Sequence, residues 1–286
     1  MGDFVADAVN EAKKADVVIV FATKWSTEGQ DQADFSLPNG QDALIEAVAT
    51  ANPHTIVVLE TGNPVAMPWL DKTAAVLEAW YPGARGGEAI ASVLFGETNP
   101  SGRLPITFPK SAQQLPRPVL DGYAELEPNF AGDAPTKGAR LTADYDIEGS
   151  DVGYRWFARK GEKALFPFGF GLSYTSFASS GLKSDGKTAS FTLGNTGGRA
   201  GATVGQLYLV SRAGRPKQRL VGFKRVELAA GATQRVSVAI DPRLLADWNN
   251  GGWTIPAGDY VFALGTDAEH LGPGVTVRMA ARTWKD

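Results

Sequence analysis

The spacing of hydrophobic residues changes along this chain, from a pattern typical of a parallel α/β sheet to one typical of a β-sandwich. In the first third, apolar runs at 16–22 and 55–59 alternate with segments such as 3–14 and 40–51, whose apolar residues recur at helical spacing. Consecutive apolar residues are typical of a parallel strand buried on both faces. From about residue 170, apolar and polar residues alternate. Several short strands of this kind, separated by glycine or proline turns, predict a β-sandwich.

These patterns divide the 286 residues into three parts. Residues 1–110 are predicted to form an α/β domain whose largely parallel sheet is covered by helices, the third of them at about 87–95. Residues 111–165 carry scattered prolines and little periodicity, which predicts a long connector with an ordered end near 153–157. Residues 166–286 are predicted to form the β-sandwich. The expected fold class is therefore α/β plus all-β.

The loops after the predicted strands are the expected positions of functional residues. Further strands are predicted at 76–80 and 103–108. In open parallel sheets, ligands bind beyond the carboxyl ends of the strands. The loops 23–39, 60–68 and 81–87 begin at such ends, so we expect a site to be built from them.

Composition argues against several classes of function. The net charge is −3 and no block of Lys or Arg stands out, so neither nucleic acid nor an anionic membrane is expected as a partner. The chain has no cysteine and only two histidines, His54 and His270. A cysteine nucleophile, a Ser-His relay and a multi-histidine metal site are therefore not expected. We expect no metal and no cofactor.

The sequence leaves the cellular compartment open. No segment is apolar for long enough to span a membrane. The first residues lack a positively charged region before an apolar run, so a signal peptide is not expected. The absence of cysteine does not fix the compartment either, because secreted enzymes can also lack it.

Four stretches of the chain carry a family pattern. They are STEGQD at 26–31, WYPG at 80–83 continuing to GGEA at 86–89, PSGRLP at 100–105, and GYR at 153–155 followed by FPFGFGLSYT at 166–175. Together they resemble the second and third domains of family 3 glycoside hydrolases of the β-glucosidase kind. The resemblance covers about residues 10–282. It implies an α/β sandwich, incomplete at its N-terminal side, followed by an immunoglobulin- or fibronectin type III-like β-sandwich.

The resemblance also implies an activity, namely hydrolysis of β-glucosides with retention of configuration. Such a reaction uses two carboxyl groups about 5–5.5 Å apart, one as nucleophile and one as acid/base. In the family the nucleophile is an Asp on a large barrel that precedes this region, and the chain has no such barrel. We therefore expect a chain that is truncated, nicked or naturally reduced, and that is nearly inactive on β-glucosides by itself because it lacks the nucleophile. Members of the family are often periplasmic or secreted.

The resemblance assigns the acid/base role to Glu28, the glutamate of the Ser-x-Glu-Gly stretch. This residue follows the carboxyl end of a predicted strand. Trp25 could supply an apolar wall that raises the pKa of the carboxyl group, as a general acid at neutral pH requires. Gly29 allows the backbone to turn there. The alternative interpretation is a solvated loop glutamate without a catalytic role.

Three residues are candidates for substrate binding: Trp25, Asp31 and Trp69. The two indole rings could stack on sugar rings, and the alternative for each is packing. Asp31 belongs to the family stretch, in which Asp is often followed by Arg, whereas Gln32 follows here. We therefore expect Asp31 to orient the loop rather than to catalyse. Trp80 ends a predicted strand and is expected to pack.

Two further hypotheses remain open for the isolated chain. One is a stand-alone hydrolase such as an esterase, although the Ser-x-x-Lys matches at 180–183 and 184–187 fall on a predicted turn. The other is a non-catalytic module that binds carbohydrate or protein. The expected partners are a β-glucoside or oligosaccharide, and a barrel domain or a second copy at an exposed apolar face.

Overall fold

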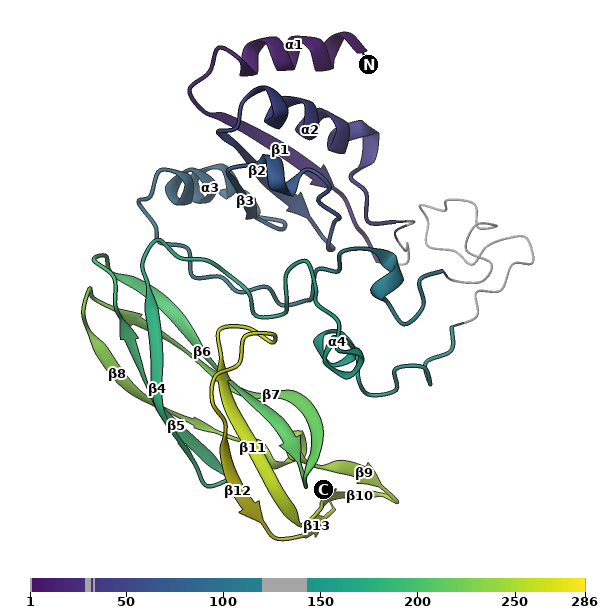
Figure 1. The fold of residues 1–286 in the computed structure, drawn as a ribbon, viewed down its shortest axis with the longest axis vertical. Coiled ribbons are helices and arrows are strands. Elements are labelled where there is room, and N and C mark those ends of the chain that lie inside the picture. Colours follow the sequence, from purple (N-terminus) through teal and green to yellow (C-terminus); the bar gives the residue numbers. More distant parts are fainter. Residues whose placement is uncertain (1, 29–31, 33, 120–142, 286) are drawn as a thin grey trace. The chain divides into compact units, whose positions relative to one another are not determined.

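The computed structural model describes residues 2–28, 32, 34–119 and 143–285 (Figure 1). The chain forms two compact units, which are considered separately. The first comprises Met1–Ser92 and Phe108–Ile147, and the second comprises Val93–Thr107 and Glu148–Asp286. The segment 93–107 thus lies with the second unit.

The first unit contains a three-stranded parallel sheet. Its order is β1-β2-β3, with β1 at Val18–Lys24, β2 at Thr55–Thr61 and β3 at Ala75–Glu78. The helices are α1 Gly2–Ala12, α2 Gln41–Ala51 and α3 Gly86–Leu94, and α1 lies beside α2 (Figure 1). The predicted alternation of helices with parallel strands is confirmed. None of the helices that the structure describes is long and apolar enough to cross a membrane.

The buried side chain of Asn52 joins the end of α1 to the start of β2. Its amide group donates hydrogen bonds to the carbonyl oxygens of Ala12 (2.9 Å) and Ala15 (2.8 Å). Its carbonyl oxygen accepts one from the N–H of His54 (2.9 Å). A single polar side chain thus bonds carbonyl groups at the end of the helix and just beyond it.

Strand β1 differs from the expectation of a strand buried on both faces. Val17, Ile19 and Phe21 are 53%, 40% and 55% exposed, whereas Ala22 is fully buried. Side chains alternate between the two faces of a strand, so the three exposed residues share one face. The apolar run of β1, which is an edge strand of this sheet, is therefore covered on one face only.

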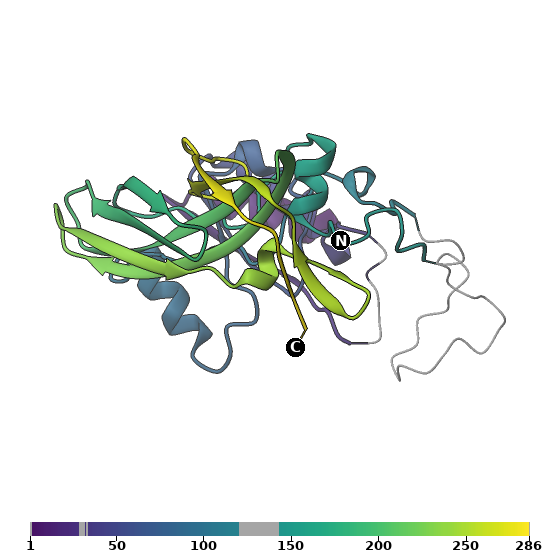
Figure 2. The same ribbon diagram turned by 90° about the horizontal axis from the view of Figure 1, so that it is seen from below.

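The second unit is an antiparallel β-sandwich, which confirms the prediction from the two-residue period. One sheet has the order β12-β11-β6-β7 and the other β4-β5-β8. The strands are β4 Phe177–Ser184, β5 Thr188–Asn195, β6 Gly201–Arg212, β7 Arg215–Leu228, β8 Thr233–Ala239, β11 Gly258–Gly265 and β12 Val275–Met279. A small sheet adds β9 Asp247–Asn249, β10 Gly252–Ile255 and β13 Arg282–Trp284. From both directions these strands, coloured green to yellow, form one body (Figures 1 and 2).

The strand predicted at 103–108 is not formed. Leu104 instead exchanges backbone hydrogen bonds with an irregular segment, since its N–H donates to the carbonyl of Phe170 and its carbonyl accepts from Gly169 (2.8 Å each). Pro105 has no N–H group with which to continue a ladder. This pairing explains why residues 93–107 belong with the sandwich.

Gly205 on β6 allows the two sheets of the sandwich to approach closely. A Cβ atom at this position would lie 2.5 Å from the ring of Phe191, which is fully buried. A glycine is therefore required where β6 crosses the Phe191 ring.

We predict that Gly205→Ala lowers the free energy of unfolding of the sandwich by about 1–3 kcal/mol, because the core must shift to admit a methyl group. Gly198→Ala is the matched control, since nothing lies within 4 Å of a Cβ atom there. Urea unfolding followed by tryptophan fluorescence measures both variants. Equal stability of the two would contradict the packing described for β6.

Candidate functional site

The carboxyl ends of the three parallel strands bring three loops together in the first unit. Ser26 follows β1, Asn63 follows β2 and Tyr81 follows β3. The side-chain amide of Asn63 donates to the Ser26 hydroxyl oxygen (3.0 Å). The N–H of Ser26 donates to the Tyr81 hydroxyl oxygen (2.6 Å), and that hydroxyl donates to the Ser26 carbonyl (3.2 Å). The three predicted loops therefore meet at Ser26.

Gly62 makes this convergence possible. A Cβ atom at this position would lie 2.5 Å from the Tyr81 hydroxyl oxygen and 2.9 Å from Cβ of Ser26. Any side chain here would separate the loop after β1 from the loop after β3. The glycine is thus explained by the close approach of the Tyr81 hydroxyl.

Glu28 lies two residues beyond Ser26, in a turn, with its side chain exposed. Trp25, on the other side of Ser26, is 65% exposed. Its carbonyl oxygen accepts a hydrogen bond from the side chain of Gln32 (3.3 Å). Asp31 lies outside the described residues. The structure thus presents both Glu28 and Trp25 on the surface at the edge where ligands are expected.

Trp69 is placed in the core, so the expectation that it stacks on a sugar ring is corrected in favour of packing. Its side chain has no exposed surface. The indole N–H donates to one carboxylate oxygen of Asp42 (2.8 Å), and the other oxygen accepts from the N–H of Leu37 (2.9 Å). A buried ring has no face free for a ligand. Trp69 instead joins the start of α2 to the segment that follows the Glu28 loop.

Lys24, which the sequence did not single out, anchors the far side of the Glu28 loop. Its ammonium group donates to the carbonyl oxygens of Asp34 (2.6 Å) and Ser36 (2.7 Å). The side chain is 7% exposed, and burial lowers its pKa, against the opposing effect of the Asp34 carboxylate. A lysine within an otherwise apolar strand was the available signal. The loop is therefore held at Lys24 and at Ser26.

Glu78 is a second functional candidate that the sequence did not single out. It ends β3, where burial raises the pKa of its carboxyl group to about 7. Hydrogen bonds from the N–H of Trp80 (3.0 Å) and from the Thr61 hydroxyl (3.3 and 3.4 Å) oppose this shift. The sequence feature that could have pointed to Glu78 is its position as the single acidic residue at the end of the run AVLE.

Trp80 packs, as the sequence predicted. Its ring meets that of Phe108 edge-on, with centroids 6.0 Å apart and an interplanar angle of 65°. Its backbone adopts a left-handed conformation with φ of 54°. This conformation is unfavourable for a residue with a side chain, so its surroundings must hold it in place.

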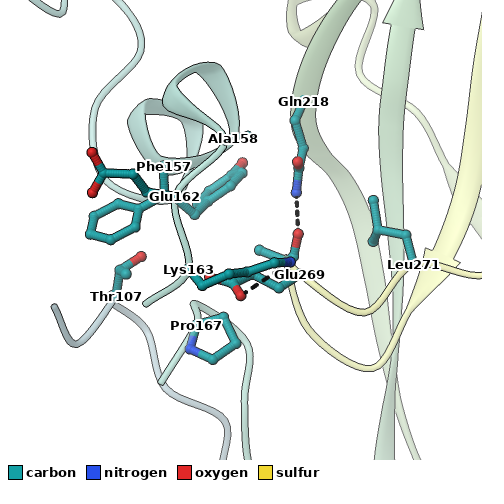
Figure 3. Close-up of a pocket in the computed structure, with 12 residues that line it drawn as sticks. Thr107, Phe157, Ala158, Glu162, Lys163, Pro167, Gln218, Glu269 and Leu271 are labelled. Carbon is teal, nitrogen blue, oxygen red and sulfur yellow. Dashed lines mark hydrogen bonds and ion pairs between the residues drawn. The ribbon is translucent and has the colours of Figure 1, made fainter. Parts of the chain in front are cut away.

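The second unit contains a hollow of about 280 Å³ that the sequence analysis did not anticipate. Phe157 of α4 (Tyr154–Lys160) and Pro167 contribute apolar surface to it (Figure 3). Lys163 and Glu269, whose charged atoms are 3.5 Å apart, also line it (Figure 3). The Glu269 carboxylate additionally accepts from the N–H of Ala164 (2.8 Å), so both charges have partners within the protein.

Comparison with known proteins identifies the family to which this chain belongs. The model of the glycosyl hydrolase family 3 C-terminal domain matches residues 2–174, and that of a fibronectin type III-like domain matches residues 203–268. The chain belongs to glycosyl hydrolase family 3. It carries the family's C-terminal α/β domain, with the loops around Ser26 inside the matched region, followed by a fibronectin type III-like sandwich.

Curated relatives of the chain are β-glucosidases about three times as long as the match. β-Glucosidase B of Emericella nidulans is 39% identical over 304 residues, covering 99% of this chain and 35% of that protein. A β-glucosidase of Rhizobium radiobacter is 39% identical over 290 residues, covering 96% and 34%. The chain thus spans about a third of the length of these two family 3 relatives.

Solved structures of β-glucosidases share the fold. The crystal structure of DesR, a β-glucosidase from Streptomyces venezuelae in complex with D-glucose, is 42% identical with a TM-score of 0.79, covering 96% of this chain and 35% of that one. A β-glucosidase from Kluyveromyces marxianus in complex with glucose is 31% identical with a TM-score of 0.83, covering 99% and 34%.

The raised pKa of Glu78 predicts a pH dependence of stability. The folded state retains this proton up to about pH 7, whereas the unfolded state releases it near 4.5. The free energy of unfolding should therefore fall as pH rises through this window and level off above it, by up to roughly 3 kcal/mol. Glu78→Gln should remove this fall.

Urea unfolding of the chain and of Glu78→Gln at pH 5, 6, 7 and 8 measures the difference between the two curves, in which contributions from other carboxylates cancel. We expect the original chain to lose stability relative to the variant as pH rises. Parallel curves would show that Glu78 does not retain its proton.

Proposed function

We propose that this chain supplies the acid/base loop of a retaining β-glucosidase, with Glu28 as the acid/base. The observation that carries the proposal is the placement of Glu28 two residues beyond Ser26, where three loops are hydrogen-bonded together. Membership of the family supports the reaction class, since the relatives named above are β-glucosidases.

The proposed chemistry has two steps. Glu28 first protonates the oxygen of the leaving group while a carboxylate nucleophile forms a glycosyl-enzyme intermediate. As a carboxylate, Glu28 then takes a proton from the water that hydrolyses this intermediate. The nucleophile would come from the barrel that the family resemblance implies. An exposed carboxyl group on an anchored loop suits this role, because it can approach a substrate held by another domain.

Two neighbours of Glu28 have proposed roles in substrate binding. Trp25 offers an exposed indole face, and such faces make extensive contacts with apolar surfaces of a ligand. Asp31 is proposed to orient the loop, as its place in the family stretch implies. Trp69 is not included, since its buried ring already packs in the core.

A chimera tests the acid/base role. This chain would replace the matching third of the Rhizobium radiobacter β-glucosidase, which is 39% identical to it. We predict that Glu28→Gln lowers kcat/KM by about 10²–10⁴-fold for a glucoside with a poor leaving group such as methanol. For dinitrophenyl β-glucoside the loss should be much smaller, because that leaving group needs no protonation.

Glu88→Gln is the matched control in the chimera, because Glu88 is an exposed glutamate paired with Arg85. It should leave both rates nearly unchanged. Losses of equal size on the two substrates for Glu28→Gln would argue against a general acid. Cleavage of an aryl acetate by the 286-residue chain that ignores Glu28→Ala would favour the esterase hypothesis instead.

The exposed face of β1 favours a second function, in which the chain associates through an apolar surface. Val17, Ile19 and Phe21 form one apolar stripe on an edge strand. Such stripes on soluble proteins mark interaction sites. For the isolated chain, we propose that a second copy occupies this stripe.

We predict that the isolated chain dimerises as its concentration is raised, and that the double variant Ile19→Thr, Phe21→Thr stays monomeric over the same range of concentrations. Threonine retains the strand preference while removing apolar surface. Phe223→Thr, at an exposed phenylalanine of β7, is the control and should not change association. Analytical ultracentrifugation distinguishes these outcomes, and a monomeric original chain would exclude the proposal.

A further inference from the structure

The carboxyl group of Glu78 is connected to Ser26 by a first route through β3. Its Oε1 accepts a hydrogen bond from the N–H of Trp80 (3.0 Å). This bond holds the residue whose left-handed backbone turns the chain at the end of β3. The next residue is Tyr81, whose hydroxyl both accepts from the N–H of Ser26 and donates to its carbonyl.

A second route runs through β2. The Thr61 hydroxyl lies 3.3 and 3.4 Å from the two carboxyl oxygens of Glu78 and 2.9 Å from the carbonyl oxygen of Asn63. The side-chain amide of Asn63 in turn donates to the hydroxyl oxygen of Ser26 (3.0 Å). Both routes from one carboxyl group therefore end on the same residue.

The second route depends on the protonation of Glu78, because the Thr61 hydroxyl has one hydrogen. When Glu78 is protonated, its O–H donates to Thr61, which donates to the carbonyl of Asn63. When Glu78 is ionised, the carboxylate competes with that carbonyl for the same hydrogen. Besides this hydroxyl, the backbone N–H groups of Trp80 and Thr61 face the carboxyl group, and no charged side chain of the described residues contributes to its pKa shift.

We infer that Glu78 is a positioning residue for the loop that carries Glu28, acting on Ser26 through Trp80 and Tyr81 on one side and through Thr61 and Asn63 on the other. The catalytic consequence of this inference rests on the proposed function. Efficient acid catalysis requires the acid within a few tenths of an ångström of its productive place, so a group that fixes Ser26 affects Glu28, two residues away.

Nuclear magnetic resonance on the 286-residue chain tests the inference without any turnover. The Ser26 backbone amide and the Asn63 side-chain amide should shift with a midpoint near pH 7, where Glu78 titrates. In Glu78→Gln this midpoint should vanish, while hydrogen exchange of the Ser26 amide stays within about twofold, because the neutral amide keeps both hydrogen bonds. In Glu78→Ala that exchange should quicken at least tenfold.

Two further variants separate the routes from a general loss of structure. Thr61→Val should remove the midpoint at Asn63 and leave the protection of Ser26 by Tyr81 largely intact. Glu60→Gln is the matched control, since Glu60 also lies on β2 but on the opposite face from Thr61, and it should change neither signal. No titration near pH 7 at either amide, or unchanged exchange in Glu78→Ala, would overturn the inference.

Kinetics of the chimera separate this inference from the proposed function. Glu78→Ala should lower kcat at least tenfold with little change in KM, because the hydrogen bonds that position Ser26 are lost. In Glu78→Gln, kcat should stay within about threefold of the value for the unsubstituted chimera, because the neutral amide keeps those hydrogen bonds. Suppose that Glu28→Gln loses activity equally on the two substrates while the amide signals behave as expected. The catalytic consequence would then be excluded, whereas the positioning of Ser26 by Glu78 would still hold. An unchanged kcat in Glu78→Ala, alongside a positive result for Glu28, would overturn the positioning role.

Discussion

Parallel strands end at a common edge of their sheet, and the polar groups of the loops that follow must find partners there. In this protein they find them on Ser26, which accepts hydrogen bonds from Asn63 after β2 and Tyr81 after β3 and donates its own N–H to the Tyr81 hydroxyl. The arrangement is possible only because Gly62 leaves room for the Tyr81 hydroxyl. Glu28 lies two residues beyond this point, in the turn that follows Ser26. At the same edge, the buried Lys24 donates hydrogen bonds to the carbonyl oxygens of Asp34 and Ser36, at the far end of the Glu28 loop.

Much of the fold could be predicted from the sequence, because the spacing of apolar residues along the chain depends on the local secondary structure. The apolar run before Thr23 and the alternation after residue 170 each correspond to strands in the structure. What it missed depends on neighbours far away in the chain. Phe21 lies on the uncovered face of β1, and the buried Trp69 finds a partner for its indole N–H in Asp42, 27 residues earlier. Neither fact can be deduced from residue type.

The site shows the same limit in another form. Glu28 and Trp25 could be proposed from a family pattern, whereas Glu78 belongs to none of the quoted stretches. Its importance comes from burial and from two hydrogen-bonded routes that join three strands, which appear only in three dimensions. The expected strand at 103–108 failed for a local reason, since Pro105 cannot donate to a ladder, and that signal was present in the sequence.

The central claim is that this chain provides the acid/base of a β-glucosidase whose nucleophile lies in another domain. Its most direct test is hydrolysis of an aryl β-glucoside by the 286-residue chain, alone and mixed with the remaining two-thirds of the Rhizobium radiobacter enzyme that it resembles. We predict no turnover by either part alone, and turnover by the mixture that Glu28→Ala removes. Turnover by the chain alone, or by a mixture indifferent to Glu28→Ala, would contradict it.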